Sequence, residues 1–489
     1  MSASRRPPEI AESSFRQLRR LVDEPFELFA DAVRDHGNVF VMHVTGQAPW
    51  VMLGEPEAVR TVFRASADEI HNDADGIKYL VGQHTVLFLN GEAHRRERRI
   101  LTPPFKHERM VVYADRMLAR TDDAIDRLSE GQVIDAFQLV QDVALQVIVE
   151  CVFGVEAPER RARLSSLFSQ HLAVMQTGPM ALASMAMGGE RLRGLLRMGT
   201  ELRRSKARLD GPIPTSRNPL ARFFDTKAEL DAMLKDELER CRREGEGRDD
   251  VLALLVRARY DDGAPMSDGS LHDELFALLV GGHETSAITL SWALHFLLTH
   301  PAALAKAKAE LEEHFGDGPI TPRGVERLRY IPAAIDETMR LRPVATSVPR
   351  KLAVPMRMAG YDFPVGTRTM PAPAILHFRE DLWPNAQAFE PERFLGERPS
   401  PFHYLPWGGG SRACLGRPFA QVELRIVLAE LLRRVDFRLV DASTTKPVLR
   451  GMLVGPSDGV PLVVEKVRPR GGKRREKAGL GAQSLEKST

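Results

Sequence analysis

The sequence predicts a mainly α-helical protein with small β sheets. From residue 91 to residue 314, apolar residues recur at spacings of three and four, which is the period of a half-buried helix. Runs with the composition of β strands are short and lie toward the two ends, within residues 38–53 and 343–464. No internal repeat or change of composition divides the chain, so its 489 residues allow about three domains or one large enzyme domain.

The first hundred residues predict one helix and a small sheet. Residues 26–35 have helical spacing, and residues 38–44 and 49–53 have the composition of strands joined by a Thr-Gly-Gln turn. Residues 1–24 are polar and lack the apolar stretch of a signal peptide or membrane anchor. We therefore expect a flexible N-terminal segment, no membrane anchor and a cytoplasmic protein.

The central and C-terminal regions predict further helices and strands. The apolar spacing indicates helices over residues 114–128, 133–152, 160–175 and 271–298. Between them, residues 178–198 are rich in Met, Ala and Gly, and residues 210–219 carry Pro and Ser, which favours a mobile helix–loop–helix cover. After residue 343, short strands and Pro-rich segments precede a helix over 418–435 and a last β region that ends at 464.

Charge and cysteine content exclude several classes of protein. The net charge is +2, but residues 466–489 hold eight Lys/Arg against two Glu, which is +6 and leaves residues 1–465 at −4. A body without cationic surplus does not favour binding of nucleic acid, and the basic end, which is almost free of apolar residues, predicts a disordered tail. Three widely spaced cysteines without a CxxC pair argue against a disulfide framework or zinc module and indicate a reducing compartment.

The sharpest motif surrounds Cys414, in the segment 405–420, Leu-Pro-Trp-Gly-Gly-Gly-Ser-Arg-Ala-Cys-Leu-Gly-Arg-Pro-Phe-Ala. Pro418 is tolerated in the first turn of a helix, so a helix begins just after the cysteine. Backbone N–H groups at a helix N-terminus stabilise a thiolate, the form that binds a metal or acts as a nucleophile. Three consecutive glycines would also let the backbone turn tightly and approach a flat ligand. A lone cysteine is more often structural, and only these surroundings favour a site.

Two adjacent glycines lie inside the long helix predicted over 271–298, in the segment 281–285, Gly-Gly-His-Glu-Thr. Each costs about 1 kcal/mol relative to Ala in mid-helix, so each needs a reason. Close approach of a ligand is one reason, and a helix crossing is the other. Ser270 with Asp273 forms a capping box at the start, and Pro301 ends the helix, which predicts roughly thirty residues.

Two motifs carry charge. The segment 91–99, Gly-Glu-Ala-His-Arg-Arg-Glu-Arg-Arg, places His94 and Arg98 on one helix face, where both can bind the same anionic group. The alternative is a solvated basic helix. Glu337 and Arg340 lie at i and i+3, and Arg393 can join them in a charge network, although such a pair alone is usually a surface ion pair.

Together these motifs resemble the cytochrome P450 family. The segment Trp407-x-x-Gly410-x-Arg412-x-Cys414-x-Gly416 is similar to the haem-ligand signature of the family, with Trp407 where the family usually has Phe. The motifs at His94, at Gly281 and at Glu337 resemble further signatures of the family, and they follow one another along the chain in the same order as in the family. The resemblance covers residues 25–465 and implies a single domain of the cytochrome P450 fold that encloses haem b, iron protoporphyrin IX. Residues 466–489 remain outside it as the tail.

The resemblance implies a role for each site residue. Cys414 would be the axial thiolate ligand of the iron, and Thr285 and Glu284 would deliver protons on the oxygen-binding side. The Glu337 network would support the cysteine loop. The implied cofactor contacts are His94, Arg98, Arg350 and Arg412 at the propionates, Trp407 beside the sulfur, and Gly281 and Gly416 in the haem pocket.

The implied activity is that of a monooxygenase, which inserts one oxygen atom of dioxygen into an apolar small molecule by hydroxylation or epoxidation. Analogy with the family places the substrate pocket in mostly apolar segments, at residues 72–90, 175–196, 276–281, 344–348 and 452–454. Two alternatives stay open. One is a haem-thiolate enzyme that uses peroxide or isomerises its substrate, and the other is a non-catalytic haem sensor or carrier.

The expected partner is a separate electron donor, because the residues after 465 are too few to form a reductase module. We expect a soluble ferredoxin with its own reductase. Its expected docking surface is a cationic patch of Arg95, Arg96, Arg99 and Arg417, which would attract an acidic protein to a body that is −4 overall.

Overall fold

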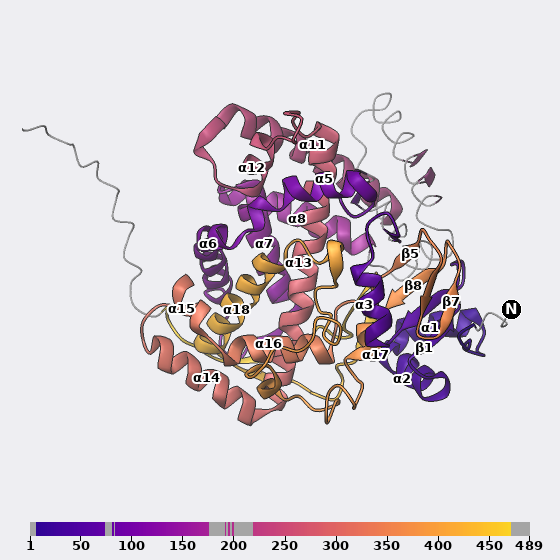
Figure 1. The fold of residues 1–489 in the computed structure, drawn as a ribbon. Coiled ribbons are helices and arrows are strands. Elements are labelled where there is room, and N and C mark those ends of the chain that lie inside the picture. Colours follow the sequence, from indigo (N-terminus) through magenta and orange to yellow (C-terminus); the bar gives the residue numbers. More distant parts are fainter. Residues whose placement is uncertain are drawn as a thin grey trace, which may run out of the picture.

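The structure is a computed structural model that describes residues 6–73, 81–82, 84–175, 191, 194–195, 198–199 and 219–470. Its helices form one large body, and the strands of the largest sheet lie together on one side of it, beside the N-terminal helices (Figure 1). The mainly helical fold with small sheets is therefore confirmed. The expected cover over 178–198 and 210–219 lies almost wholly outside the described residues.

The helices expected from the spacing of apolar residues are present. The helix predicted over residues 133–152 begins at Ala136, because residues 133–135 form a strand that pairs with the C-terminal strand. The helices of the body are α5 (Gly91–Leu101), α6 (His107–Ile125), α7 (Ala136–Phe153), α8 (Pro158–Met175), α11 (Pro219–Glu244), α12 (Val251–Arg257), α13 (Asp268–Thr299), α14 (Pro301–Phe315), α15 (Pro322–Arg327), α16 (Tyr330–Leu341) and α18 (Arg417–Arg434).

Helix α13 runs through the centre of the body and packs against α7, α16 and α18 (Figure 1). It is 32 residues long and buried along most of its length, as its nearly continuous apolar sequence requires. The predicted capping box at Ser270 and Asp273 is wrong. Ser267 caps the helix by accepting a hydrogen bond from the backbone N–H of Ser270 at 3.1 Å, and Asp273 is used elsewhere. The helix ends at Thr299, before Pro301, as predicted.

Helix α7 is, within the described residues, the one single helix long and apolar enough to cross a membrane. Its mean hydropathy is 1.5, but 72% of it is buried inside the fold. Helices α13 and α14 pass the same test only when taken together, and they meet at an angle of 110°. Helix α7 is thus buried as a core helix of the fold is.

The largest sheet has five strands in the order β1 (Val39–Met42), β2 (Trp50–Leu53), β8 (Arg368–Pro371), β5 (Arg350–Leu352) and β3 (Ile70–Asn72). The strands expected near residues 38–44 and 49–53 are β1 and β2, which pair antiparallel. In the last pair of the sheet, Asn72 lies opposite Arg350. The other strands are β4 (Val133–Asp135), β12 (Pro461–Val467) and β9 (Val435–Leu439) in a second sheet, and the hairpins β6 (Met356–Met358) with β7 (Tyr361–Phe363) and β10 (Pro447–Arg450) with β11 (Leu453–Pro456).

Both ends of the domain extend beyond the predicted boundaries. In the segment expected to be flexible, Ser14–Asp23 form helix α1, which buries Leu18 and Leu21 against the fold. The buried Gln17 anchors the same face of the helix by donating to the carbonyl oxygens of Ile10 and Glu12, at 3.3 and 2.6 Å. At the other end, β12 continues to Val467, and Arg470 pairs with Asp126 on α6. Residues 471–489, the rest of the expected tail, lie outside the described residues.

The charge network expected at Glu337 is present, and its central pair, Glu337 and Arg340, is fully buried. Arg340 donates to both carboxylate oxygens of Glu337, at 2.7 and 2.8 Å, and Arg393 lies 3.3 Å from the same carboxylate. Arg340 also donates to the carbonyl oxygens of His377 and Ala386, both at 2.7 Å. The network therefore fixes the irregular chain that leads into the cysteine loop.

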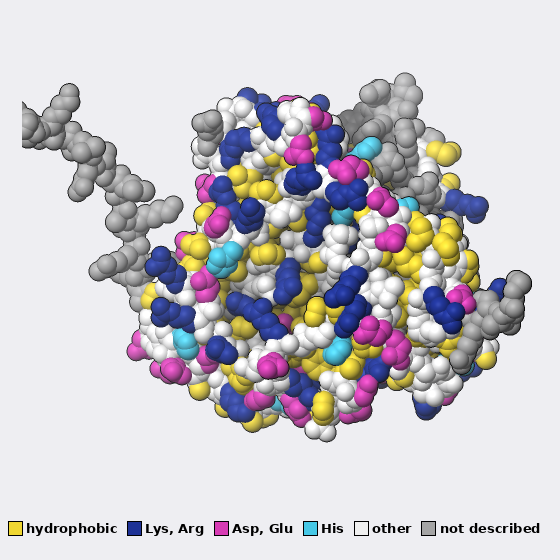
Figure 2. Space-filling model, viewed as in Figure 1, with side chains coloured by type: hydrophobic (Ala, Val, Ile, Leu, Met, Phe, Trp, Pro, Cys, Tyr) yellow, Lys and Arg dark blue, Asp and Glu magenta, His cyan; other side chains and the backbone are white. Residues whose placement is uncertain are grey.

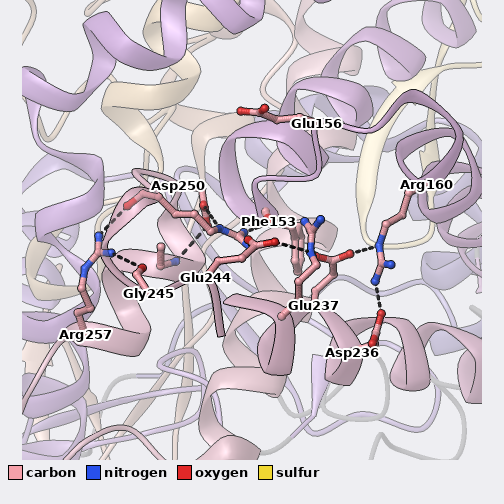
Figure 3. Close-up of polar contacts among 12 residues, drawn as sticks. Phe153, Glu156, Arg160, Asp236, Glu237, Glu244, Gly245, Asp250 and Arg257 are labelled. Atoms are coloured by element: carbon pink, nitrogen blue, oxygen red, sulfur yellow. Dashed lines mark hydrogen bonds and ion pairs between the residues drawn. The ribbon is translucent and has the colours of Figure 1, made fainter. Parts of the chain in front are cut away.

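A second ion network holds the C-terminal half of α11 (Figure 3). Arg160 on α8 pairs with Asp236 and Glu237. Arg248 donates to Asp250 at 2.7 Å and to the carbonyl oxygen of Phe153, at the end of α7, at 2.5 Å. This end of α11 is thus tied to α7, α8 and the start of α12.

Candidate active site

The loop that carries Cys414 is closed by its own backbone. The N–H of Cys414 donates to the carbonyl oxygen of Trp407 at 2.9 Å, and φ is positive at Gly408 and Gly410. A Cβ at Gly409 would lie 2.1 Å from the ring of Phe63 on α3 (Pro56–Arg64). The glycines therefore make the predicted tight turn, and Gly409 also allows the close packing of the loop on α3.

Cys414 lies just before α18, as predicted, and is the exposed member of the three cysteines. Many protein atoms still surround the thiol, and this burial raises its pKa. The backbone N–H groups of Gly416 and Arg417 and the charge of Arg98 act in the opposite direction. The predicted stabilisation of a thiolate by the helix N-terminus is thus present but smaller than the effect of burial. A cation at the sulfur would favour the thiolate further.

Four basic side chains gather beside this loop, and we call His94, Arg98, Arg350 and Arg412 the cationic cluster. Arg98 donates to the carbonyl oxygen of Ala413 at 2.6 Å, and Arg412 donates to the carbonyl oxygen of Leu89 at 2.7 Å. Arg350 donates to Oδ1 of Asn72 at 3.1 Å. These partners are neutral, and no carboxylate forms an ion pair with the three arginines in the described part of the chain.

The members of the cationic cluster lower one another's pKa, because each positive charge disfavours the charged form of its neighbours. Burial, together with Arg412, Arg98 and Arg350, lowers the pKa of His94 to about 4. Burial also lowers the pKa of Arg350 and of Arg412 to about 10, with a further contribution from a neighbouring arginine in each case. His94 is 2% exposed and its Nδ1 has no hydrogen-bond partner. Such a cluster fits a ligand with two carboxylates, as the haem propionates would provide.

The paired glycines of α13 serve two different purposes. A Cβ at Gly282 would lie 2.5 Å from Cδ1 of Ile148 on α7, so this glycine is explained by the helix crossing. A Cβ at Gly281 would meet nothing within 4 Å, and the residue is exposed although its helix is mostly buried. Packing therefore explains Gly282 but not Gly281, where the ligand explanation stays a prediction.

A less buried stripe of α13 marks the side of the helix that faces the site. Ala277, Gly281 and Thr285 lie at i, i+4 and i+8, and each is more exposed than the surrounding buried residues. The hydroxyl of Thr285 donates to the carbonyl oxygen of Gly281 at 2.9 Å, and Glu284 is 7% exposed. Helix α18 meets α13 one residue further on, where Ser286 donates to Glu423 at 2.6 Å. The Thr285 stripe thus lies next to the helix that follows Cys414.

The structure also places Gly416, Trp407 and two segments of the expected substrate pocket. Gly416 is the residue before α18, and a Cβ there would meet nothing within 4 Å. Trp407 packs in a small cavity with Asp336 of α16 and Arg425 of α18. Two expected segments of the substrate pocket lie side by side, since the N–H of Val454 donates to the carbonyl oxygen of Val344 at 2.8 Å.

Sequence reasoning missed the residues that support these groups. His377 accepts a hydrogen bond from the N–H of Leu405 at 2.9 Å and so holds the start of the cysteine loop. Oδ1 of Asn90 accepts a hydrogen bond from Arg412 at 2.6 Å. No motif distinguishes these residues, because their partners lie 28 and 322 positions away in the sequence.

The expected cationic patch on α5 is largely neutralised. Arg96 forms an ion pair with Asp262 at 2.8 Å, and Arg99 pairs with Asp261. Arg95 pairs with Glu92 at 3.0 Å. The prediction of a patch at Arg95, Arg96 and Arg99 is therefore wrong, because the turn before α13 folds two aspartates onto α5.

Other arginines remain without an acidic partner at the same face. Arg398 and Arg417 are exposed and form no ion pair within the described residues, and they act with Arg425 on the single carboxylate of Asp336. Figure 2 shows Lys and Arg side chains gathered over the middle of this face, where α16 and α18 lie in Figure 1, with Asp and Glu mostly toward the rim. This cationic surface adjoins the cavity that contains Trp407.

Comparison with known proteins gives consistent results. A family model described as Cytochrome P450 matches residues 13–462. Cytochrome P450 135B1 of Mycobacterium tuberculosis is 34% identical over 443 residues, which cover 89% of this chain and 86% of that protein. Cytochrome P450 138 of the same organism is 30% identical over 465 residues, which cover 94% of this chain and 97% of that protein.

Two solved structures share the fold. The cyanobacterial protein CYP120A1, bound to retinoic acid, has a TM-score of 0.78 at 20% identity and covers 95% of this chain and 100% of its own. The haem domain of cytochrome P450DA has a TM-score of 0.78 at 22% identity and covers 95% and 99%.

Proposed function

Because the chain belongs to the cytochrome P450 family, we propose that it inserts one oxygen atom of dioxygen into an apolar small molecule, with electrons from separate redox proteins. The family membership makes the chain a haem-thiolate monooxygenase that binds haem b through a cysteine thiolate. When bound, the haem supplies the activation of dioxygen and the transfer of oxygen. The chain must hold the haem, exclude water, move protons and select the substrate.

One observation carries the assignment of the site: the cationic cluster has no carboxylate partner in the described chain and adjoins Cys414. We assign Cys414 as the ligand, because Cys151 and Cys241 are buried in the core. We assign His94, Arg98, Arg350 and Arg412 to the propionates. Trp407 would pack beside the sulfur, and Gly281 and Gly416 would leave room for the ring.

Thr285 and Glu284 are our candidates for proton delivery. The hydroxyl of Thr285 lies on the less buried stripe of α13 and already donates to a backbone carbonyl, so it can orient a water by accepting a hydrogen bond. The buried carboxyl of Glu284 is the adjacent acid. The pair supports a dioxygen-dependent reaction more than the use of peroxide.

An apolar substrate is supported by the residues around this stripe. The partly exposed side chains near Gly281 are Ala277, Leu278 and Val280. The adjoining segments 344–348 and 452–454 contribute mainly Val, Leu and Met. Such walls favour the binding of a molecule without charge, and we propose hydroxylation or epoxidation as the reaction.

We propose a soluble ferredoxin with its own reductase as the electron donor, in the cytoplasm. The surface that supports it is the one at Arg398, Arg417 and Arg425, in place of the arginines of α5. A cationic surface on an anionic body would attract a small acidic protein to the side of the cysteine loop.

The test is turnover of the haem-loaded protein with an added ferredoxin, its reductase and ¹⁸O₂. Compounds that shift the haem spectrum on binding would be the substrates tried. We expect a product that contains one ¹⁸O atom and depends on the reductase. A product without ¹⁸O, or a product that forms with peroxide but not with dioxygen and the reductase, would contradict the proposal.

A further inference from the structure

Residues 84–90, which we call the bridge loop, are bonded to two acidic side chains of α13. The N–H of His84 donates to Oδ2 of Asp273 at 3.1 Å, and the N–H of Val86 donates to Oε1 of Glu274 at 2.5 Å. The chain just before the loop packs on the same side chain, since a Cβ at Gly82 would lie 2.3 Å from the carboxyl carbon of Asp273. The first part of the loop is thus held against α13.

The other end of the bridge loop holds two members of the cationic cluster. Arg412 donates to the carbonyl oxygen of Leu89 at 2.7 Å and to Oδ1 of Asn90 at 2.6 Å. Asn72 donates to the carbonyl oxygen of Leu87 at 2.5 Å and accepts a hydrogen bond from Arg350 at 3.1 Å. The bridge loop therefore lies between α13 and both arginines.

Glu274 occupies a position that packing alone does not explain. It is 2% exposed and lies between the buried apolar residues Leu271, Leu275 and Phe276. Burial raises its pKa to about 8, and the nearby acids Glu97 and Asp273 add to the effect. No Lys, Arg or His forms an ion pair with it in the described part of the chain. Burying a carboxyl costs more free energy of folding than burying an apolar side chain would. The hydrogen bond from Val86 offsets this cost and explains why a carboxyl occupies the position.

We propose that Asp273 and Glu274 are positioning residues, which set the places of Arg350 and Arg412 through the bridge loop. The inference rests on the proposed function, because these arginines matter through the propionates that we assign to them. A bridge loop released from α13 would leave Arg412 without its fixed partners at Leu89 and Asn90. It would also free the Asn72 side chain, which binds Arg350 and is held by the carbonyl oxygen of Leu87. The haem would then be held less tightly while the cysteine loop, fixed by His377 and Trp407, stays intact.

The experiment measures the rate at which the ferric holoprotein loses haem to excess apomyoglobin. The variants are Glu274→Leu, which removes the acceptor, Glu274→Gln, which keeps an acceptor oxygen, and Gly82→Ala, which forces Asp273 aside. The matched control is Asp231→Asn, since Asp231 on α11 contacts His272 on the same turn of α13 without touching the loop.

We expect haem loss to be about tenfold faster in Glu274→Leu and in Gly82→Ala, the effect of one or two weakened charge-assisted bonds. Glu274→Gln and Asp231→Asn should lose haem at the wild-type rate. The carbon monoxide spectrum of all four should retain the thiolate band.

Wild-type rates in both Glu274→Leu and Gly82→Ala would overturn the inference. If Glu274→Leu does not fold, Gly82→Ala decides alone. Equally fast loss in Glu274→Gln and Glu274→Leu would also overturn it, because the acceptor oxygen would then be irrelevant. A failure of the proposed function is distinguishable, since it would appear in the wild type as a missing thiolate band or a product without ¹⁸O.

Discussion

Arg98 on α5 donates a hydrogen bond to the carbonyl oxygen of Ala413, 2.6 Å away and directly before Cys414. The bond joins the helix that carries His94 to the loop that carries the proposed ligand. The same arginine acts on both the thiol of Cys414 and the imidazole of His94. The proposed iron ligand and the proposed propionate contacts are therefore one unit, and a change in one should be measurable in the other.

Arg412→Gln should raise the pKa of His94 and weaken haem binding. Arg412 is the charged group that lowers the pKa of His94, about 4, the most, so its removal should move that pKa toward the ordinary value. Loss of one charge-assisted bond should lower haem affinity by roughly tenfold or more. NMR titration of the apoprotein and a haem titration measure the two effects. The control Arg99→Gln changes an exposed arginine paired with Asp261. A pKa of His94 that is the same in wild type and Arg412→Gln would contradict the cluster.

Thr285→Ala should uncouple electron consumption from product formation. The substitution removes the hydroxyl bonded to the carbonyl oxygen of Gly281 while the helix and the cationic cluster stay unchanged. Reductant should then yield mainly peroxide, measured as product and peroxide formed per electron. Thr285→Ser keeps the hydroxyl and should remain coupled. Unchanged product per electron in Thr285→Ala would favour the peroxide-using alternative.

Charge reversal at Arg398 and Arg417 should slow reduction by the ferredoxin. Neither has an acidic partner in the described residues, so Arg398→Glu with Arg417→Glu removes the attraction directly. The rate of reduction in the wild type should fall steeply with ionic strength, since electrostatic attraction raises association rates by about 10- to 1,000-fold at low salt. Substrate-induced spectra should not change. The matched control, Arg96→Glu with Arg99→Glu, alters arginines already paired with aspartates and should have the smaller effect. A larger effect in the control than in Arg398→Glu with Arg417→Glu would show that the ferredoxin docks at the arginines of α5.

The contribution of Glu423 to stability should fall as the pH rises from about 5 to about 8, whereas buried histidines such as His94 act in the opposite direction below pH 6.5. Burial raises the pKa of Glu423 from 4.5 to about 8, so the folded protein keeps a proton that the unfolded chain releases. The stabilisation is therefore complete below the unfolded pKa and is lost as pH rises through the folded pKa. Glu274 acts in the same direction. Urea unfolding of wild type and Glu423→Gln at pH 5, 7 and 9 isolates this contribution, and the difference in the free energy of unfolding between the two proteins should change by an amount on the order of 3 kcal/mol across that range. The same pH profile in wild type and variant would refute this origin.

Much of the site could be predicted because its residues lie in short local motifs. Cys414 and Arg412 share one loop, His94 and Arg98 share one helix face, and Thr285 lies in the glycine segment of α13. In each case the spacing of a few residues defines the geometry. The helices were predictable for the same reason, since the period of their apolar residues is local.

What could not be predicted depends on contacts between distant segments. The need for glycine at Gly409 comes from Phe63, and Arg96 is neutralised by Asp262, 166 residues away. Asp273 has the spacing of a capping residue, but its carboxylate is bonded to His84 instead. Helix α1 was mistaken for a flexible segment because only a few of its residues are apolar.

The central claim is that Cys414 binds the haem iron, and the carbon monoxide spectrum of the reduced protein tests it most directly. The wild type, Cys151→Ser and Cys241→Ser should show the red-shifted Soret band of a thiolate-bound haem, since these two cysteines are buried away from the loop. Cys414→Ser should lose that band while it retains α-helical content. A red-shifted band that persists in Cys414→Ser would contradict the assignment of the ligand and the account of the site built on it.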